Sequence, residues 1–308
     1  MASSLQGIQR VAKSNFELLP YGAKIDGWNL PGRGEAYADC GHKLVFGCLD
    51  VESHSQARID GVDVVGKVFV KLKKRSCLRA QCPVCYEKWA AKEAHKMTYR
   101  LNQWKGSGRV IHVTLSPPRS EWYTSLEALR STVYKLAKEI GVFGGSCVVH
   151  PFRQTCIFCG SNKDVLTERC SKCGCSQFSW IYSPHYHLLA YGWIHGEKVK
   201  AIYDRTGWIS KNHGVRGSVE GTAFYELSHA GIKEGIHTVT WFGRLAYNVL
   251  RVTPEPEEKE VCPLCASIGI EKTLDRILWV GPGELPYDDE GEYFDDPDHW
   301  VKGWSGYG

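Results

Sequence analysis

Two histidines separated by one residue, His185 and His187, form the pattern in this sequence best suited to metal chemistry. They lie in the apolar run SPHYHLLAYG, which is typical of a buried strand. Because side chains alternate between the two faces of a strand, both imidazoles should project from one face and Tyr186 from the other. Two imidazoles on one face can share one divalent cation, so we expect a metal site here.

A third ligand is expected, because two imidazoles hold Mg²⁺ or Mn²⁺ poorly and hard cations favour additional oxygen or nitrogen donors. His150 is the candidate, since it lies on a strand expected to pair with the strand of the histidine pair. His112, on an earlier strand, is the alternative. A structural role for either histidine stays open at this point.

Most of the thirteen cysteines fall in C-x2-C pairs, in a chain that begins without an apolar signal sequence, which favours zinc over disulfides. Two such pairs, ten residues apart, predict a zinc ribbon with four thiolate ligands. These ligands are Cys156, Cys159, Cys170 and Cys173. Cys175 is a spare that could replace Cys173. A ribbon of about 20 residues is too small for a core of its own and should need the metal to fold.

A second cysteine cluster lies nearer the N-terminus, in RSCLRAQCPVC and DCGHKLVFGC. Its members are Cys40, Cys48, Cys77, Cys82 and Cys85, with His42 close by. Cys77, Cys82 and Cys85 need a fourth ligand, and Cys48 or Cys40 is the natural donor. A second ion is expected if Cys262 and Cys265 join the cluster; otherwise that pair is an unligated dithiol. We therefore expect one to three zinc ions. Their role should be structural, because thiolate-rich sites have no open coordination position for catalysis.

The charge distribution points to a polyanionic partner. The net charge is +4, but residues 284–308 carry eight acids and one base, which leaves +11 on the rest of the chain. Lysine and arginine that neutralise phosphates release counterions, so such a body suits nucleic acid. No apolar run reaches the ~20 residues of a membrane span, and we expect a cytoplasmic protein with no membrane partner.

The periodicity of apolar residues predicts the elements that position these side chains. A helix is expected over 86–104, followed by a strand over 109–118, a helix over 124–140, strands near 146–152 and over 180–193, a helix over 197–205, a strand near 215–219 and a helix over 222–230. From residue 109 to 219 the order is strand, helix, strand, strand, helix, strand. That order predicts an α+β, ferredoxin-like antiparallel sheet with helices packed on one face.

The expected domains follow from these elements. Residues 1–105 form an N-terminal zinc-binding region, 106–255 the central domain with the ribbon inserted at 155–176, and 256–308 a C-terminal segment with a CxxC pair and an acidic tail. The stretch GVDVVGKV at 61–68 resembles a phosphate-binding loop but lacks the Ser or Thr that binds Mg²⁺. We therefore expect no ATPase.

The motif SPHYHLLAYG resembles the metal motif of the His-hydrophobic-His (HUH) endonucleases, in particular rolling-circle replication initiators of plasmids and viruses. RVIHVTLSPP is similar to the first motif of that family, and GTAFYELSHAGI is similar to its third, a helix that carries a tyrosine. CLRAQCPVCYEKWAAKEA resembles a cysteine segment that precedes the nuclease domain in some initiators. The pattern, over about residues 40–250, looks most like archaeal plasmid or virus proteins.

The resemblance implies roles for particular residues. His185 and His187 would bind a catalytic Mn²⁺ or Mg²⁺, and Tyr225 would be the nucleophile. The family often has a lysine soon after the tyrosine, whereas this chain has His229 on the same helical face, so a charge-stabilising role would pass to His229. No second tyrosine follows directly, which leaves Tyr247 as the rival nucleophile.

The activity implied is nicking and joining of single-stranded DNA at a replication origin. Attack by the tyrosine would leave a 5′-phosphotyrosine and a free 3′-hydroxyl that primes synthesis, with a separate helicase and polymerase as partners. Glu220 or Glu226 is a candidate to activate water, although the sequence favours a solvated surface acid for each. A related transposase or relaxase would share this chemistry. A zinc-ribbon protein that binds nucleic acid without catalysis is the alternative from a different class.

Overall fold

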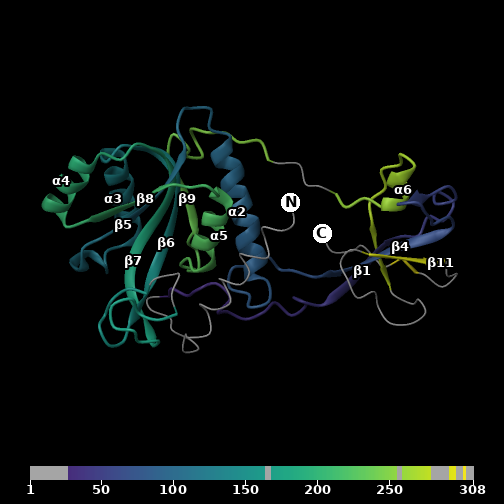
Figure 1. Cartoon of the computed structure of the whole chain (residues 1–308), viewed down its shortest axis with the longest axis horizontal. Helices are drawn as coiled ribbons and strands as arrows, with labels where there is room; N and C mark the ends of the chain where they lie inside the picture. The colour runs from purple at the N-terminus through teal and green to yellow at the C-terminus, as the bar shows by residue number, and fades with distance from the viewer. Residues whose placement is uncertain (1–26, 164–167, 255–258, 279–290, 296–300, 303–308) are drawn as a thin grey trace. The chain divides into compact units, whose positions relative to one another are not determined.

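The computed structural model describes residues 27–163, 168–254, 259–278, 291–295 and 301–302. The chain divides into two compact units, which are described separately (Figure 1). The larger unit comprises residues 1–36 and 78–254, and the smaller unit comprises 37–77 and 255–308. Both contain antiparallel sheets, so the α+β class expected from the sequence is confirmed. Within the described residues, no helix is long and apolar enough to cross a membrane.

The larger unit is built on a five-stranded antiparallel sheet with the order β8-β5-β7-β6-β9. Its strands are β5 (Val110–Ser116), β6 (Val142–Cys156), β7 (Phe178–Gly192), β8 (Ile209–Val215) and β9 (Val239–Gly243). The long β6 and β7 pair along most of their length and form a hairpin whose far end carries the cysteine ribbon (Figure 1). This hairpin places His150 directly opposite His185.

Helices cover both faces of this sheet (Figure 1). The helices are α2 (Tyr86–Asn102), α3 (Leu126–Glu139), α4 (Gly196–Thr206) and α5 (Val219–Ser228), with a short 3₁₀ turn, η2, at Arg119–Glu121. The apolar residues of α3 and α4 share one core with Tyr186, whereas those of α2 and α5 share the other core with Leu189. The expectation of helices on one face is therefore correct for α3 and α4 but omits the layer that α2 and α5 form over the histidine face.

The predicted elements occur in the expected order, but several bounds differ: β6 is longer than the expected 146–152, and α5 begins at Val219 rather than at residue 222. The last strand of the series ends at Val215, where its beginning was expected, because residues 216–218 connect it to α5. Helix α3 is capped by Ser125, whose hydroxyl accepts a hydrogen bond from the Ala128 amide at 3.3 Å. Helix α5 is capped in the same way by Ser218, which accepts from the Gly221 amide at 3.0 Å.

The smaller unit contains a second antiparallel sheet, with the order β11-β4-β1-β10-β12. Its elements are β1 (Lys43–Cys48), β4 (Lys67–Lys74), β10 (Asp275–Leu278), β11 (Glu292–Asp295) and β12 (Val301–Lys302), with a hairpin of β2 (Arg58–Ile59) and β3 (Val62–Asp63) and a short helix, α6 (Pro263–Ser267). Because β10 pairs with β1, the C-terminal segment completes a sheet begun near the N-terminus. The smaller unit therefore joins residues 37–77 with residues 255–308, which were expected in separate domains. Most of the acidic tail lies outside the described residues.

Candidate metal centres

Three buried histidines converge on the α2 and α5 face of the larger sheet. His150 from β6 and His185 and His187 from β7 each offer a ring nitrogen, and these nitrogens lie within 4.8 Å of one another. The centroids of the rings of His150 and His187 are 4.2 Å apart. The alternation predicted for SPHYHLLAYG therefore places both histidines on one face, and Tyr186 packs with α3 on the other. The structure brings together the three residues that the sequence selected for a catalytic cation.

The hydrogen bonds around this group leave one nitrogen of each ring free for a ligand. The Nδ1 atom of His185 lies 2.9 Å from the Ser183 carbonyl, so Nδ1 carries the proton and Nε2 carries the lone pair. His150 bonds the Glu226 backbone, while its buried Nε2 has no hydrogen-bond partner. The Nδ1 atom of His187 is 2.8 Å from Nε2 of His112, which leaves Nε2 of His187 for the group. An orphaned buried nitrogen fits an imidazole that binds a metal.

Burial keeps these imidazoles neutral, which is the form that binds metal. The pKa values of His150, His185 and His187 lie well below the ordinary value, first because burial penalises the charged form and second because neighbouring cationic groups oppose protonation. For His185 the largest of these neighbours is Arg153. A divalent cation among three neutral nitrogens meets the ligand preferences of Mn²⁺ and Zn²⁺ better than those of Mg²⁺.

Of the two candidate nucleophiles, Tyr225 is the one linked to the three-histidine group, through a contact with His229. Its ring lies 4.3 Å, centroid to centroid, from the ring of His229, four residues later at the end of α5. The His229 ring is 4.7 Å from that of His150. Tyr247, by contrast, is two-thirds exposed, and its ring lies 4.7 Å from the guanidinium of Arg100 on α2. The geometry places Tyr225 and His229 beside the three-histidine group and does not place Tyr247 there.

His112 and Glu226 form a second group with His187 on the same face. Their ligand atoms lie within 4.8 Å of one another, and Nε2 of His112 is 3.3 Å from Oε1 of Glu226. The Glu226 side chain is completely buried, so the expectation of a solvated surface acid is wrong for this residue. Glu220 is half exposed, 3.6 Å from His95, as expected of a surface acid. The ring of His213 from β8 stacks on His112 at 4.3 Å.

The predicted zinc ribbon has its four cysteines in place at the tip of the β6–β7 hairpin. The sulfur atoms of Cys156 and Cys173 are 3.4 Å apart, and those of Cys159 and Cys170 are also 3.4 Å apart. All four lie within 4.8 Å of one another, which is compatible with one structural zinc ion. The spare Cys175 is not part of this group; its sulfur accepts a hydrogen bond from the Gln177 amide instead.

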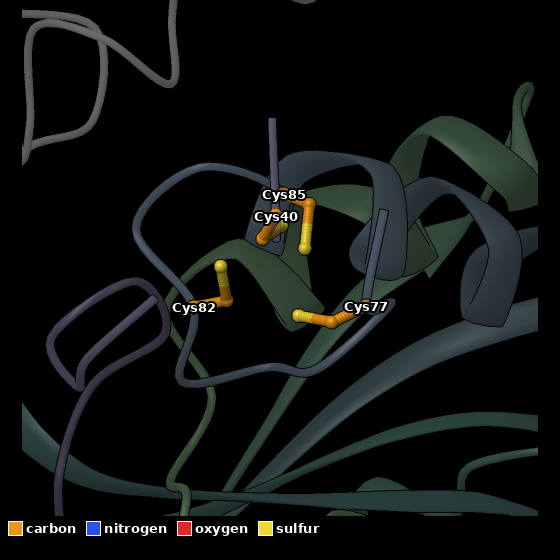
Figure 2. Close-up of side chains that lie close together, drawn as sticks. All are labelled: Cys40, Cys77, Cys82 and Cys85. Atoms are coloured by element: carbon orange, nitrogen blue, oxygen red, sulfur yellow. The ribbon is translucent and has the colours of Figure 1, made fainter. Parts of the chain in front are cut away.

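The N-terminal cysteines separate into two groups. Cys40, Cys77, Cys82 and Cys85 have sulfur atoms within 4.8 Å of one another, and their side chains point toward a common centre (Figure 2). This arrangement settles the choice of fourth ligand in favour of Cys40, and it is compatible with structural zinc. His42 is exposed and is not a member of the group.

Cys48 belongs to a separate group with Cys262, Cys265 and His54, all of them buried. Nε2 of His54 lies 3.3 Å from the sulfur of Cys265 and 3.5 Å from that of Cys262. Its Nδ1 is 2.8 Å from the Lys67 carbonyl, so Nδ1 donates there and Nε2 faces the sulfurs. Hydrogen bonding from Cys262 lowers the pKa of Cys48 to about 5. The group is compatible with a third structural zinc ion. This arrangement is the alternative in which Cys262 and Cys265 join the N-terminal cysteines.

Sequence reasoning missed His54 and undervalued Glu226. His54 lies in ESHSQ, without a C-x2-C neighbour, and is more than 200 residues from Cys262, so no local spacing reveals it. A signal for Glu226 does exist: it follows Thr222 by four residues, on the face of α5 that also carries Ala223 and Leu227. A carboxylate on the apolar face of a helix is expected to be buried.

The comparisons with known proteins identify no relative of this chain. No protein-family model matches the chain, and no curated protein or solved structure is significantly similar to it.

Proposed function

We propose that the chain is a replication initiator that nicks and rejoins single-stranded DNA, with Tyr225 as the nucleophile and a divalent cation held by His150, His185 and His187. The observation that carries this proposal is the chain of contacts from Tyr225 through His229 to His150, on the sheet face where the three-histidine group lies. A nucleophile and a cation site on one face are the two parts that phosphodiester transfer requires.

The topology supports the same assignment. Numbered within the series β5, β6, β7 and β8, the strands lie side by side in the order 4-1-3-2, with β9 added beyond β6. Together with α3 and α4 on one face, this strand order supports the ferredoxin-like arrangement expected from the sequence. The motif order first strand, histidine strand, tyrosine helix also corresponds to β5, β7 and α5.

The cation, Tyr225 and His229 would have different roles in the proposed reaction. A bound Mn²⁺ or Mg²⁺ would supply positive charge to a phosphodiester oxygen and so favour in-line attack. Tyr225 is a weak nucleophile, with a reference pKa near 10, until a neighbouring group assists it. His229 contacts both the Tyr225 ring and the His150 ring and has its own pKa lowered by burial to about 4. It is therefore neutral at pH 7, so it can accept a hydrogen bond from the phenol but does not provide a fixed charge.

The test uses end-labelled single-stranded oligonucleotides that tile the DNA around the gene for this chain. With Mn²⁺, the wild-type protein should produce a nick with a free 3′-hydroxyl, together with a labelled protein adduct, and EDTA should abolish both. A protein that binds these oligonucleotides but never cleaves them with Mn²⁺, Mg²⁺, Co²⁺ or Zn²⁺ would instead support the non-catalytic zinc-ribbon alternative. Joining of transposon ends or transfer at an origin of transfer would favour the transposase or relaxase.

A further inference from the structure

We propose that His112, His187 and Glu226 bind a second divalent transition-metal ion beside the three-histidine group. These three side chains come from β5, β7 and α5, and one ligand atom of each lies within 4.8 Å of the others. His112 and His187 are at most 9% exposed, and Glu226 is fully buried. Two imidazoles and one carboxylate are a donor set that binds Mn²⁺, Fe²⁺, Co²⁺ or Zn²⁺.

Hydrogen bonding among the three groups does not account for this arrangement. Nε2 of His112 lies 2.8 Å from Nδ1 of His187 and 3.3 Å from Oε1 of Glu226, and one nitrogen has at most one proton to give. Neither carboxylate oxygen of Glu226 has a hydrogen-bond partner of acceptable geometry. A buried carboxylate without partners is costly, and a cation at the point where the three groups converge removes that cost.

The neighbouring polar side chains have partners of their own. His213 stacks on His112, but its Nε2 is 2.9 Å from the Thr114 hydroxyl and so is already engaged. Arg216, the cation that acts on Glu226 through its charge, donates its Nε proton to Thr222 at 3.0 Å. His187 has one nitrogen for each group, since Nδ1 faces His112 and Nε2 is left for His150 and His185. Occupation of both sites would therefore require His187 to lose its remaining ring proton and bridge the two ions as an imidazolate.

The second ion would tie the nucleophile's helix to the sheet. Glu226 directly follows Tyr225 on α5, whereas His112 and His187 are on the central strands β5 and β7. A bond from the Glu226 carboxylate to an ion held by two strands would fix the rotation of α5, and with it the approach of Tyr225 to the histidine face. This inference does not depend on the nicking reaction, because the donor set alone carries it.

The experiment counts Mn²⁺ ions bound to protein that retains its structural zinc, by electron paramagnetic resonance titration without DNA. The wild type should bind two Mn²⁺ ions, close enough for their spins to couple. Glu226→Gln, which keeps the shape of the side chain, and His112→Gln should each bind one, whereas Glu220→Gln on the same helix should still bind two. His185→Ala should lose the other ion.

One bound Mn²⁺ in the wild type, or two in a folded Glu226→Gln protein, would overturn the second site. In the first case Glu226 is a neutral acid that serves only to orient His112. Nicking by a protein that binds one ion would leave the proposed function standing. Two ions in a protein that never nicks would leave the second site standing instead.

Discussion

Replacement of His54 by alanine should remove a zinc ion and destabilise the smaller unit. His54 is fully buried and is the one ligand of its group that does not come from a cysteine. Its imidazole has two partners that alanine cannot replace: the Lys67 carbonyl at 2.8 Å and the pair of sulfurs at 3.3 and 3.5 Å. The core around it is small and consists largely of the three cysteines and a few apolar residues.

The size of the effect follows from these contacts. Loss of the partner of a partly buried carbonyl costs about 1 kcal/mol. Removal of an outer-shell partner of a metal ligand weakens metal binding by roughly 10–100-fold, or about 1.4–2.7 kcal/mol. Loss of the ligand itself should weaken zinc binding by at least as much. Together these give a loss of about 3 kcal/mol, a large fraction of the ~5–15 kcal/mol that stabilises a typical domain.

The assay combines zinc content with hydrogen exchange of the β1 and β4 amides, which report on the sheet of the smaller unit. His54→Ala should lower the zinc content by one ion per chain and speed exchange of those amides by about 100-fold, the equivalent of about 3 kcal/mol. His54→Cys should restore the ion, because it supplies a fourth sulfur. His42→Ala, an exposed histidine outside the group, should behave as wild type. Unchanged zinc and unchanged exchange in His54→Ala would refute the reasoning.

Three further predictions concern the larger unit. Cys173→Ser should lose one bound zinc ion and Cys175→Ser none, because the sulfur of Cys173 is 3.4 Å from that of Cys156 whereas Cys175 bonds Gln177. Elemental analysis of the two variants decides this. His187→Ala should abolish cleavage and leave binding to labelled single-stranded DNA within a few-fold of wild type, because phosphate contacts carry most of the affinity; parallel loss of both in a folded variant would contradict this. Without Mn²⁺ or Mg²⁺, the free energy of unfolding should fall as the pH drops through about 6.5. In the folded protein His112 and His229 have pKa values of about 3 and 4 and stay neutral at this pH, whereas in the unfolded chain the same histidines take up protons. Urea titrations at pH 8 and pH 5.5 test the sign.

The histidine group and the ribbon could be predicted because their determinants are local. Alternation along one strand fixes which face His185 and His187 share, and a hairpin partner is the simplest place for a third ligand, which is where His150 lies. The ribbon needs only two C-x2-C pairs ten residues apart. In both cases the residues that meet belong to one hairpin, either to its paired strands or to the loop that joins them.

The features that the sequence did not reveal depend on contacts between distant segments. His54 meets Cys262 and Cys265 across more than 200 residues, and β10 pairs with β1, so neither the third cysteine group nor the smaller unit follows from local spacing. Strand β8 was misplaced because ISKNHGV, at the sheet edge, alternates too weakly to be recognised. The layer of α2 and α5 over the histidine face depends on tertiary packing alone.

The most direct test of the proposed function is the identity of the residue bound to DNA. Wild-type protein, Tyr225→Phe and Tyr247→Phe would each be incubated with Mn²⁺ and labelled single-stranded oligonucleotides, and the trapped adduct would be mapped by peptide mass spectrometry. The nucleotide should lie on the peptide that contains Tyr225, Tyr225→Phe should form no adduct, and Tyr247→Phe should form it as the wild type does. A nucleotide on the Tyr247 peptide, or an undiminished adduct in Tyr225→Phe, would contradict the account.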